Sequence, residues 1–329
     1  MTPLAPTLQA FFTQRLIDQR RASPHTIASY RDTFRLLLAF AHQQTGTPPS
    51  RLQLEHLDAP LIVALLAHLE QQRHNTARTR NARLAAVHSL FRFAALAHPD
   101  HAALIARVLA IPPKRQDKAV VTFLTEPEVD ALLATPDRTS WLGRRDHTLM
   151  LLMIQTGLRV SELTALRCCD VELGRGAHLR CEGKGRKQRV TPLTSQTVRV
   201  LRAWLAEQAS EPNDPLFPAS HGGPLSRDSV ERLVDKHAKL AEHACPTLAG
   251  KSISPHVLRH TSAMRLLHAG VDVTVIALWL GHDSTRTTDI YLHADLTLKE
   301  KALARTSPPH TRARRYRAPD SLLAFLDGP

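Results

Sequence analysis

The sequence predicts a mainly α-helical protein of two domains, with a small antiparallel β-sheet in the second domain. Apolar residues recur at helical spacing through most of the 329 residues. Between residues 171 and 193 this period changes to the alternation that is typical of strands. A polar, proline-stiffened stretch over residues 112–122 breaks the apolar pattern. We therefore expect a helical domain over residues 1–111, a basic linker over 112–122, and a second domain over 123–329 that ends in a tail.

The chain is strongly basic. It contains 43 Lys and Arg residues against 30 Asp and Glu residues, which gives a formal net charge of +13 and a pI near 10.2. Such an excess favours a polyanionic partner, either nucleic acid or an acidic membrane surface, over a basic surface that serves only solubility. On charge alone, nucleic acid is the preferred interpretation. No apolar stretch approaches the ~18 residues of a membrane span, so we expect no such span.

Cysteine usage and the N-terminal segment indicate the compartment. The four cysteines are Cys168, Cys169, Cys181 and Cys245, and two of them are adjacent, which does not suit a disulfide framework. The N-terminus has no basic segment followed by an apolar run, so we expect no signal peptide. Reduced thiols in the cytoplasm are the prediction that fits both features.

Capping residues predict where the helices of the first domain begin. Ser, Thr, Asp or Asn before a first turn satisfies its free N–H groups, and proline suits the first helical position. After a first helix over Pro6 to Arg20, we expect further helices to begin at Ser23–Pro24, Asp58–Pro60 and Asn75–Thr76.

Five basic residues of this region are candidate DNA contacts. The helix after Thr76 begins with ARTRNAR, so Arg78, Arg80 and Arg83 lie in its first two turns, where the helix dipole already favours anions. Lys114 and Arg115 add positive charge in the linker. The sequence predicts these side chains as contacts to DNA phosphates, although an ordinary solvated polar face explains the three arginines equally well.

The second domain is expected to combine helices with three short strands. Thr125 with Glu128 forms a capping box, which marks a helix start. The glycine turn GKGRK presents Lys184 between two strands, and it places Arg186 and Lys187 beside Lys184 as further candidate DNA contacts. The strands are expected at 171–173, 178–181 and 188–193, and the helices after the capping box near residues 145, 194, 226, 254 and 272.

Several residues of the second domain suit chemistry on a phosphodiester. That reaction needs a nucleophile, positive charge on the non-bridging oxygens, and a proton for the leaving oxygen. Guanidinium groups match a phosphate best, imidazoles exchange protons near neutral pH, and a phenol can attack in a positive environment. The candidates are Arg159, Lys184, His256, Arg259, His282 and Tyr291. Taken singly, His256, His282 and Lys184 are better explained as structural residues, and it is the joint pattern of all six that favours chemistry.

In order and spacing, these motifs resemble the tyrosine recombinase (phage integrase) family. The resemblance covers the whole second domain and fills all six catalytic positions of the family. The first domain resembles the family's SAM-like core-binding domain less specifically, through the segment TIASY and its helix pattern. The motifs are TGLRVSEL around Arg159, GKG around Lys184, HVLRH from His256 to His260, LGH ending at His282, and Tyr291.

The resemblance implies a role for each of the six residues. Arg159 and Arg259 would bind the scissile phosphate and Lys184 would act as general acid. His256 would act as acid and base, and His282 would donate to the phosphate. Tyr291 would attack, leaving a 3′-phosphotyrosine link and a free 5′ hydroxyl that later reverses the reaction through a Holliday junction. Because the covalent link stores the bond energy, neither a cofactor nor a metal would be needed.

The resemblance also implies partners and an architecture. We expect a cytoplasmic enzyme of DNA recombination, integration or transposition whose two domains form a C-shaped clamp on double-stranded DNA with paired half-sites. It would assemble as a tetrameric synapse of identical or related recombinases. The sequence shows no arm-binding domain before Thr7, which favours an Xer-like or transposon-borne recombinase over a heterobivalent phage integrase.

Three alternatives remain at this point. A type IB topoisomerase uses the same chemistry without strand exchange, although the N-terminal helical domain argues against it. A DNA-binding regulator with a decayed site would not need the six residues to be intact. A metal nuclease is suggested by 19 histidines and four cysteines, but their spacing matches no zinc site.

Overall fold

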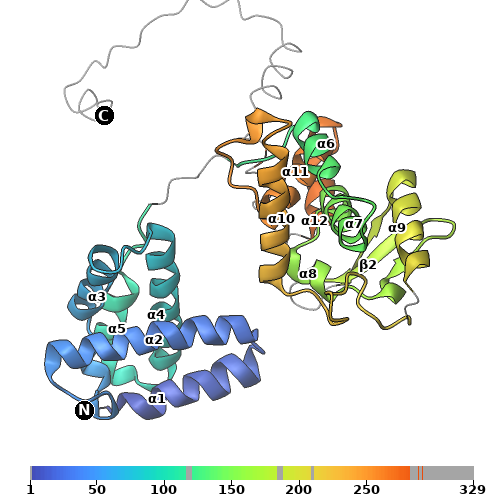
Figure 1. The fold of residues 1–329 in the computed structure, drawn as a ribbon. Coiled ribbons are helices and arrows are strands. Elements are labelled where there is room, and N and C mark those ends of the chain that lie inside the picture. The colour runs from blue at the N-terminus through green and yellow to red at the C-terminus, as the bar shows by residue number, and fades with distance from the viewer. Residues whose placement is uncertain are drawn as a thin grey trace, which may run out of the picture. The chain divides into compact units, whose positions relative to one another are not determined.

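The computed structural model describes residues 2–115, 121–183, 188–208 and 211–281, together with Thr288 and Tyr291. The chain folds into two compact units, Met1–Lys118 and Ala119–Pro329 (Figure 1). The boundary between them falls inside the stretch expected to be the linker. Each unit has its own apolar core. Within the described residues, no helix is both long enough and apolar enough to cross a membrane.

Unit 1 is helical. Ser23, Asp58 and Thr76 each accept a hydrogen bond from the first turn of the following helix, which confirms the three predicted caps. Its helices are α1 (Leu4–Ala10), η1 (Phe11–Gln19), α2 (Pro24–Thr45), η2 (Pro49–Arg51), η3 (Leu54–His56), α3 (Ala59–Gln71), α4 (Ala77–Ala97), η4 (Pro99–His101) and α5 (Ala102–Leu109).

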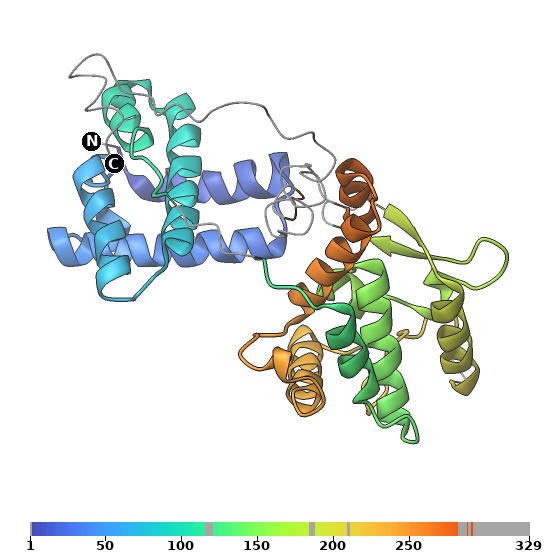
Figure 2. The ribbon, with the colours of Figure 1, turned by 90° about the horizontal axis from the view of Figure 1, so that it is seen from above.

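The first helix differs from the expectation. The single helix predicted over Pro6 to Arg20 is divided into α1 and the π-helical segment η1. This segment and α2 run side by side, as two views of the ribbon show (Figure 2). Phe11 joins them, because its ring centroid lies 6.2 Å from that of Tyr30 and 5.9 Å from that of Phe34. Burial of such large rings contributes to the stability of the core of unit 1.

Unit 2 contains helices and the predicted sheet. Its elements are α6 (Glu126–Ala134), α7 (Trp141–Thr156), α8 (Val160–Ala165), η5 (Cys168–Asp170), β1 (Val171–Glu172), β2 (His178–Glu182), β3 (Gln188–Pro192), α9 (Ser195–Glu207), α10 (Arg227–Ala241), η7 (Pro246–Leu248), α11 (Pro255–His268) and α12 (Val273–Leu280).

The sheet is antiparallel with strand order β1-β2-β3. In its register Cys181 lies opposite Arg189, and Leu179 opposite Thr191. Leu179 and Thr191 are buried, so this set of side chains faces inward. Arg189 is therefore at an inward position on its strand. The mainly α fold with one small antiparallel sheet agrees with the fold class predicted from the sequence.

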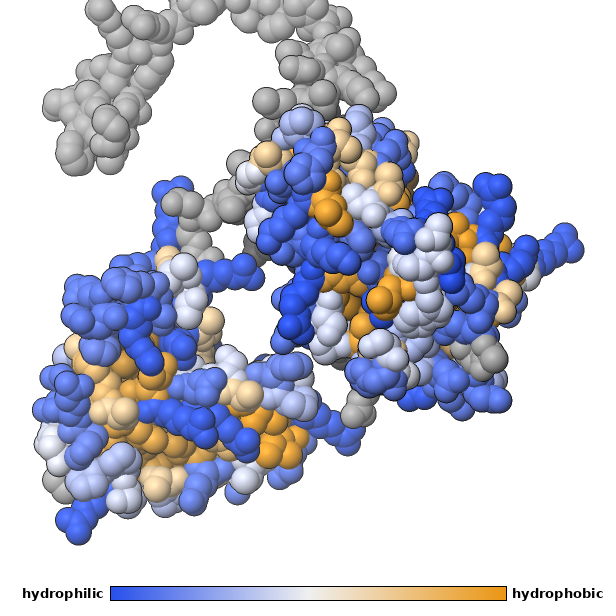
Figure 3. Space-filling view, viewed as in Figure 1, coloured by the Kyte–Doolittle hydropathy of each residue, from blue (hydrophilic) through white to orange (hydrophobic). Residues whose placement is uncertain are grey.

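Helix α7 forms the centre of unit 2. It packs against α11 on one side and α9 on another, and almost all its residues from Arg145 onward are buried. A second, smaller apolar cluster joins α11 and α12, and Tyr291 belongs to it. The space-filling view shows hydrophilic residues over most of the visible surface, with apolar residues confined to patches (Figure 3).

Candidate active site

Two predicted arginines, Arg159 and Arg259, converge on neighbouring main-chain carbonyls. Gly157 ends α7 with a φ of +64°, which turns the chain so that Arg159 caps α8. Arg159 donates through Nη2 to the carbonyl of Gly281 at 2.9 Å. Arg259, on α11, donates to the carbonyl of Gly157 at 2.5 Å and to that of Leu280 at 2.6 Å. The two guanidinium groups therefore meet at the C-terminal end of α12.

A third arginine and a buried carboxylate complete this group, which we call the arginine cluster: Arg159, Arg189, Arg259 and Glu162. Arg189, on β3, donates to the carbonyl of Leu280 and, at 2.8 Å, to Glu162 Oε2. Glu162 accepts a further hydrogen bond from Arg159 Nη1 at 2.7 Å, and its side chain is only 2% exposed. This buried carboxylate thus pairs with Arg159 and Arg189, and its charge also acts on Arg259.

The electrostatics of the cluster suit an anion. Burial lowers the pKa of Arg259 to about 10, and the nearby charges of Arg159 and Arg189 act in the same direction. The guanidinium is still charged at neutral pH, but its cationic form is stabilised less than usual. A phosphate placed beside it would restore that stabilisation, because a doubly hydrogen-bonded phosphate is the best partner of a guanidinium.

Tyr291 lies near the arginine cluster, and its hydroxyl contacts the ring of His260. Its N–H donates to the carbonyl of Thr288, and its ring packs into the small apolar cluster with 2% exposure. The phenol oxygen lies 2.9 Å from His260 Nδ1. His260 in turn contacts His256 edge to face, with 4.2 Å between ring centroids. Four residues apart, both rings project from the same face of α11.

Burial decides the ionisation of the nucleophile candidate. It raises the pKa of Tyr291 to about 12, while the charges of Arg259 and Arg159 lower it and offset only part of that effect. At neutral pH the phenol therefore keeps its proton. Attack on an electrophile would need a group that removes this proton as the new bond forms.

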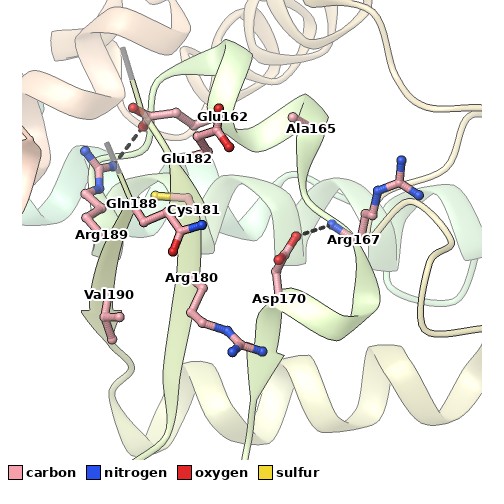
Figure 4. A pocket seen from close by; sticks show the side chains of 10 residues that line it. All are labelled: Glu162, Ala165, Arg167, Asp170, Arg180, Cys181, Glu182, Gln188, Arg189 and Val190. Atoms are coloured by element: carbon pink, nitrogen blue, oxygen red, sulfur yellow. Dashed lines mark hydrogen bonds and ion pairs between the residues drawn. The ribbon is translucent and has the colours of Figure 1, made fainter. Parts of the chain in front are cut away.

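Two cavities adjoin the arginine cluster. One, of about 290 Å³, is lined by three predicted catalytic residues, Arg159, His256 and Arg259, together with Arg227 of α10. A larger one, of about 590 Å³, lies between α8 and the β2–β3 strands, and Glu162 and Arg189 contact each other at its wall (Figure 4). The smaller cavity is the better candidate for the scissile phosphate, because the cationic and acid–base groups line it together.

The structure thus brings four of the six predicted catalytic residues into one region: Arg159, His256, Arg259 and Tyr291. Lys184 and His282 lie outside the described residues, as do the predicted DNA contacts Arg186 and Lys187. Over the described ranges, the structure gathers no group of at least three His, Cys, Asp or Glu side chains suited to a metal ion.

The basic residues predicted for DNA binding in unit 1 differ in accessibility. Arg78 and Arg115 are exposed, and Lys114 is exposed but paired with Glu70 at 2.8 Å. Arg83 is half-buried, with Nη1 3.5 Å from Thr33 Oγ1.

Arg80 has a different environment from its neighbours. It is 7% exposed and donates to the carbonyl of Pro112 and to Asn81 Oδ1. Asn81 also bonds the main chain of Lys114 in both directions. These contacts fasten the start of the linker to α4, so we omit Arg80 from the DNA contacts proposed below.

Sequence reasoning gave no role to three residues of the site, Glu162, Arg189 and His260. A basic residue at an inward strand position is unusual, and this was the available signal for Arg189. Two histidines four residues apart share a helix face, which was the signal for His260. Glu162 stands three residues after Arg159 and accepts a hydrogen bond from the Arg159 N–H, and a glutamate at this third position of a helix is the signal that the sequence offers.

The sequence matches known families in both units. Residues 122–297 match the phage integrase family, and residues 10–98 match the phage integrase N-terminal SAM-like domain. The chain belongs to the phage integrase family of tyrosine recombinases, which are site-specific DNA strand-exchange enzymes.

Two relatives show how far this similarity extends. The chain is 56% identical over 324 residues to a putative integrase/recombinase, y4rC, of Sinorhizobium fredii, covering 98% of each chain. It is 35% identical over 300 residues to the tyrosine recombinase XerC of Pelobacter propionicus, covering 90% of this chain and 93% of that one.

Solved structures share the fold at low identity. The Tn1549 transposon integrase in complex with transposon right end DNA has a TM-score of 0.68 at 16% identity and covers 93% of this chain and 99% of its own. The XerH recombinase bound to its palindromic difH substrate, in a post-cleavage complex, has a TM-score of 0.66 at 22% identity. The match covers 87% of this chain and 81% of the XerH chain.

Proposed function

We propose that this chain carries out site-specific recombination with Tyr291 as the nucleophile. The observation that carries the proposal is the position of Tyr291 beside Arg159 and Arg259, whose charges act on its phenol. Attack by the phenol oxygen on a DNA phosphate would give a 3′-phosphotyrosine link and release a 5′ hydroxyl. The 5′ hydroxyl of a partner duplex would then attack that link, and the exchange would proceed through a Holliday junction.

The other residues have distinct roles in this proposal. Arg159 and Arg259 would exchange their carbonyl partners for the non-bridging oxygens of the phosphate, where charge increases in the transition state. His256, exposed at the wall of the smaller cavity, would exchange protons with the phosphate. From the family resemblance, Lys184 would protonate the leaving 5′ oxygen and His282 would donate to the phosphate. No step requires a cofactor or a metal.

The proposed partner is double-stranded DNA with paired half-sites. The net charge of +13 supports a polyanionic partner, and the exposed Arg78 and Arg115, with Lys114, are proposed as phosphate contacts of the first domain. We further propose that residues 1–111 and 123–329 clamp one half-site between them, joined by the linker 112–122. Four protomers would form the synapse, as identical or related recombinases acting in the cytoplasm.

A covalent-trapping experiment tests the nucleophile. Sequencing DNA ends that remain bound to the protein after denaturation would identify the target site, and a nicked duplex of that sequence would then trap the cleaved complex. The chain has three tyrosines. Tyr291→Phe is expected to abolish the covalent band. Tyr316→Phe, in the basic tail outside the described residues, is the matched control and is expected to retain the band.

Experiments with the same protein and target duplexes distinguish a recombinase from the three alternative functions. Exchange of partners between two duplexes supports a recombinase, whereas relaxation of a supercoiled circle without exchange would support a topoisomerase. Wild-type protein that binds the site but forms no covalent complex would support a regulator. A metal nuclease predicts that EDTA removes cleavage, and our proposal predicts that cleavage persists.

A further inference from the structure

The hydroxyl of Tyr291 contacts a histidine that has no part in the roles assigned above. Nδ1 of His260 lies 2.9 Å from the phenol oxygen, within the range of a strong hydrogen bond. The two rings meet at 68° with 5.4 Å between their centroids, so the contact is held by packing as well. We infer that His260 is the base that takes the phenol proton when Tyr291 attacks DNA. This inference rests on the proposed function.

Geometry distinguishes His260 from His256. His256 lines the smaller cavity with Arg159 and Arg259, where a phosphate would bind. His260 lies one helical turn further on and faces the nucleophile instead. The structure therefore divides the work of the two histidines: His256 acts on the phosphate, and His260 acts on the phenol.

The chemistry of the step balances without an added reactant. The step requires the neutral tautomer of His260 with its ring hydrogen on Nε2, so that Nδ1 accepts the hydrogen bond from the phenol. During attack the Oη–H bond breaks, the proton moves to Nδ1, and the Oη–P bond forms while the P–O5′ bond breaks. The 5′ oxygen takes its proton from the general acid, the role that the family resemblance gives to Lys184. In the rejoining step the imidazolium of His260 returns the proton to the departing phenolate.

Neighbouring charges assist this transfer. A buried phenol with a pKa near 12 would rarely ionise by itself. Arg259, next to His260 in sequence, directs its guanidinium to the carbonyls of Gly157 and Leu280, and its charge lowers the pKa of the Tyr291 phenol. The phenol therefore has a proton acceptor in contact and a cation whose charge acts on it, and both help to activate a weak nucleophile.

Two substitutions separate a base from a residue that only positions the phenol. His260→Asn places an amide oxygen where Nδ1 was, so it can accept the same hydrogen bond but cannot take the proton. His260→Ala removes both abilities. Each variant would be compared with wild type in single-turnover formation of the covalent complex on the nicked site, with half-site affinity and melting temperature as checks on folding.

If His260 is the base, the His260→Asn variant should bind DNA and melt as wild type does but cleave about 10²–10⁴-fold more slowly. The deficit should be unchanged on DNA with sulfur in place of the bridging 5′ oxygen, because a thiolate leaves without a proton and only the nucleophile side remains limiting. His260→Ala should be at least as slow.

Two results would overturn the inference. One is a His260→Asn rate within about threefold of wild type, and the other is a deficit that disappears on the sulfur-containing substrate. Wild type that forms no covalent complex at Tyr291 would instead refute the proposed function, so the two failures can be told apart.

Discussion

Glu162→Gln removes the one negative charge among the four members of the arginine cluster while keeping the size of the side chain. Its carboxylate accepts hydrogen bonds from the Arg159 N–H at 2.8 Å, from Arg159 Nη1 at 2.7 Å and from Arg189 Nη2 at 2.8 Å. The amide has only one acceptor oxygen, and its NH₂ group would face a guanidinium. Breaking a buried ion pair on one side costs about 3–5 kcal/mol.

That free energy predicts a measurable change in melting temperature. A domain of 150–250 residues, such as unit 2, loses roughly 2–4 °C per kcal/mol, so Glu162→Gln should melt about 6–20 °C lower. The matched control is Glu207→Gln, which removes the same charge from an exposed bidentate pair with Arg144. Exposed pairs contribute little, so the control should melt close to wild type.

The assay is thermal unfolding followed by circular dichroism, with the covalent-complex assay in parallel. Because Glu162 orients Arg159 and Arg189, cleavage should also decrease at temperatures where the variant is folded. Equal melting temperatures for Glu162→Gln and Glu207→Gln would refute the reasoning, since they would show that the buried carboxylate is not needed to hold Arg159 and Arg189 in place.

Three further predictions concern single residues. Arg259→Ala should reduce cleavage by orders of magnitude but half-site affinity by only a few-fold, because one phosphate contact changes the salt slope by about 1; a parallel loss of both would indicate a structural arginine. Gly281→Ala should cost about 1–2 kcal/mol for its φ of +62°, and should also slow cleavage because the new Cβ would lie 2.7 Å from Arg189 Nη1. Gly270→Ala, at φ +83° with open space around it, is the control and should leave cleavage unchanged. Burial, together with the charge of Arg138, lowers the pKa of His147 to about 4. Between pH ~6.5 and 4 the His147 side chain is therefore protonated in the unfolded chain and neutral in the folded chain. Wild type should therefore lose stability between pH ~6.5 and 4, and His147→Gln should lose less in the same unfolding experiments; identical pH dependences would contradict the assignment.

The sequence was most informative where a single residue type determines local geometry. Ser23, Thr76 and Ser254 each cap the helix that the sequence predicts to begin there. These signals are local, because a cap or a left-handed residue acts within one turn of itself. Arg159 and Arg259 were found because both stand next to such boundaries within recognisable motifs.

Other features depend on contacts between distant segments. The partners of Arg189 are Glu162 and a main-chain oxygen at the end of α12, and no side-chain pattern reports a main-chain oxygen. The π-helical turns of η1 were missed because the apolar spacing over residues 11–19 fits an α-helix equally well. His260 belongs to the HVLRH motif, but its role appears only when Tyr291 lies against it.

The partners of the arginines have a consequence for genetics. The carbonyls of Gly157, Leu280 and Gly281 belong to the main chain, so exchanging the side chain at position 280 leaves its oxygen in place. A survey of every amino-acid substitution would therefore show that activity depends on the arginines. It would not show the dependence on the main-chain oxygens that accept their hydrogen bonds. Replacing the peptide bond after Leu280 with an ester would weaken that oxygen as an acceptor, and semisynthesis of this kind would expose the half of the interaction that the genetic code cannot alter.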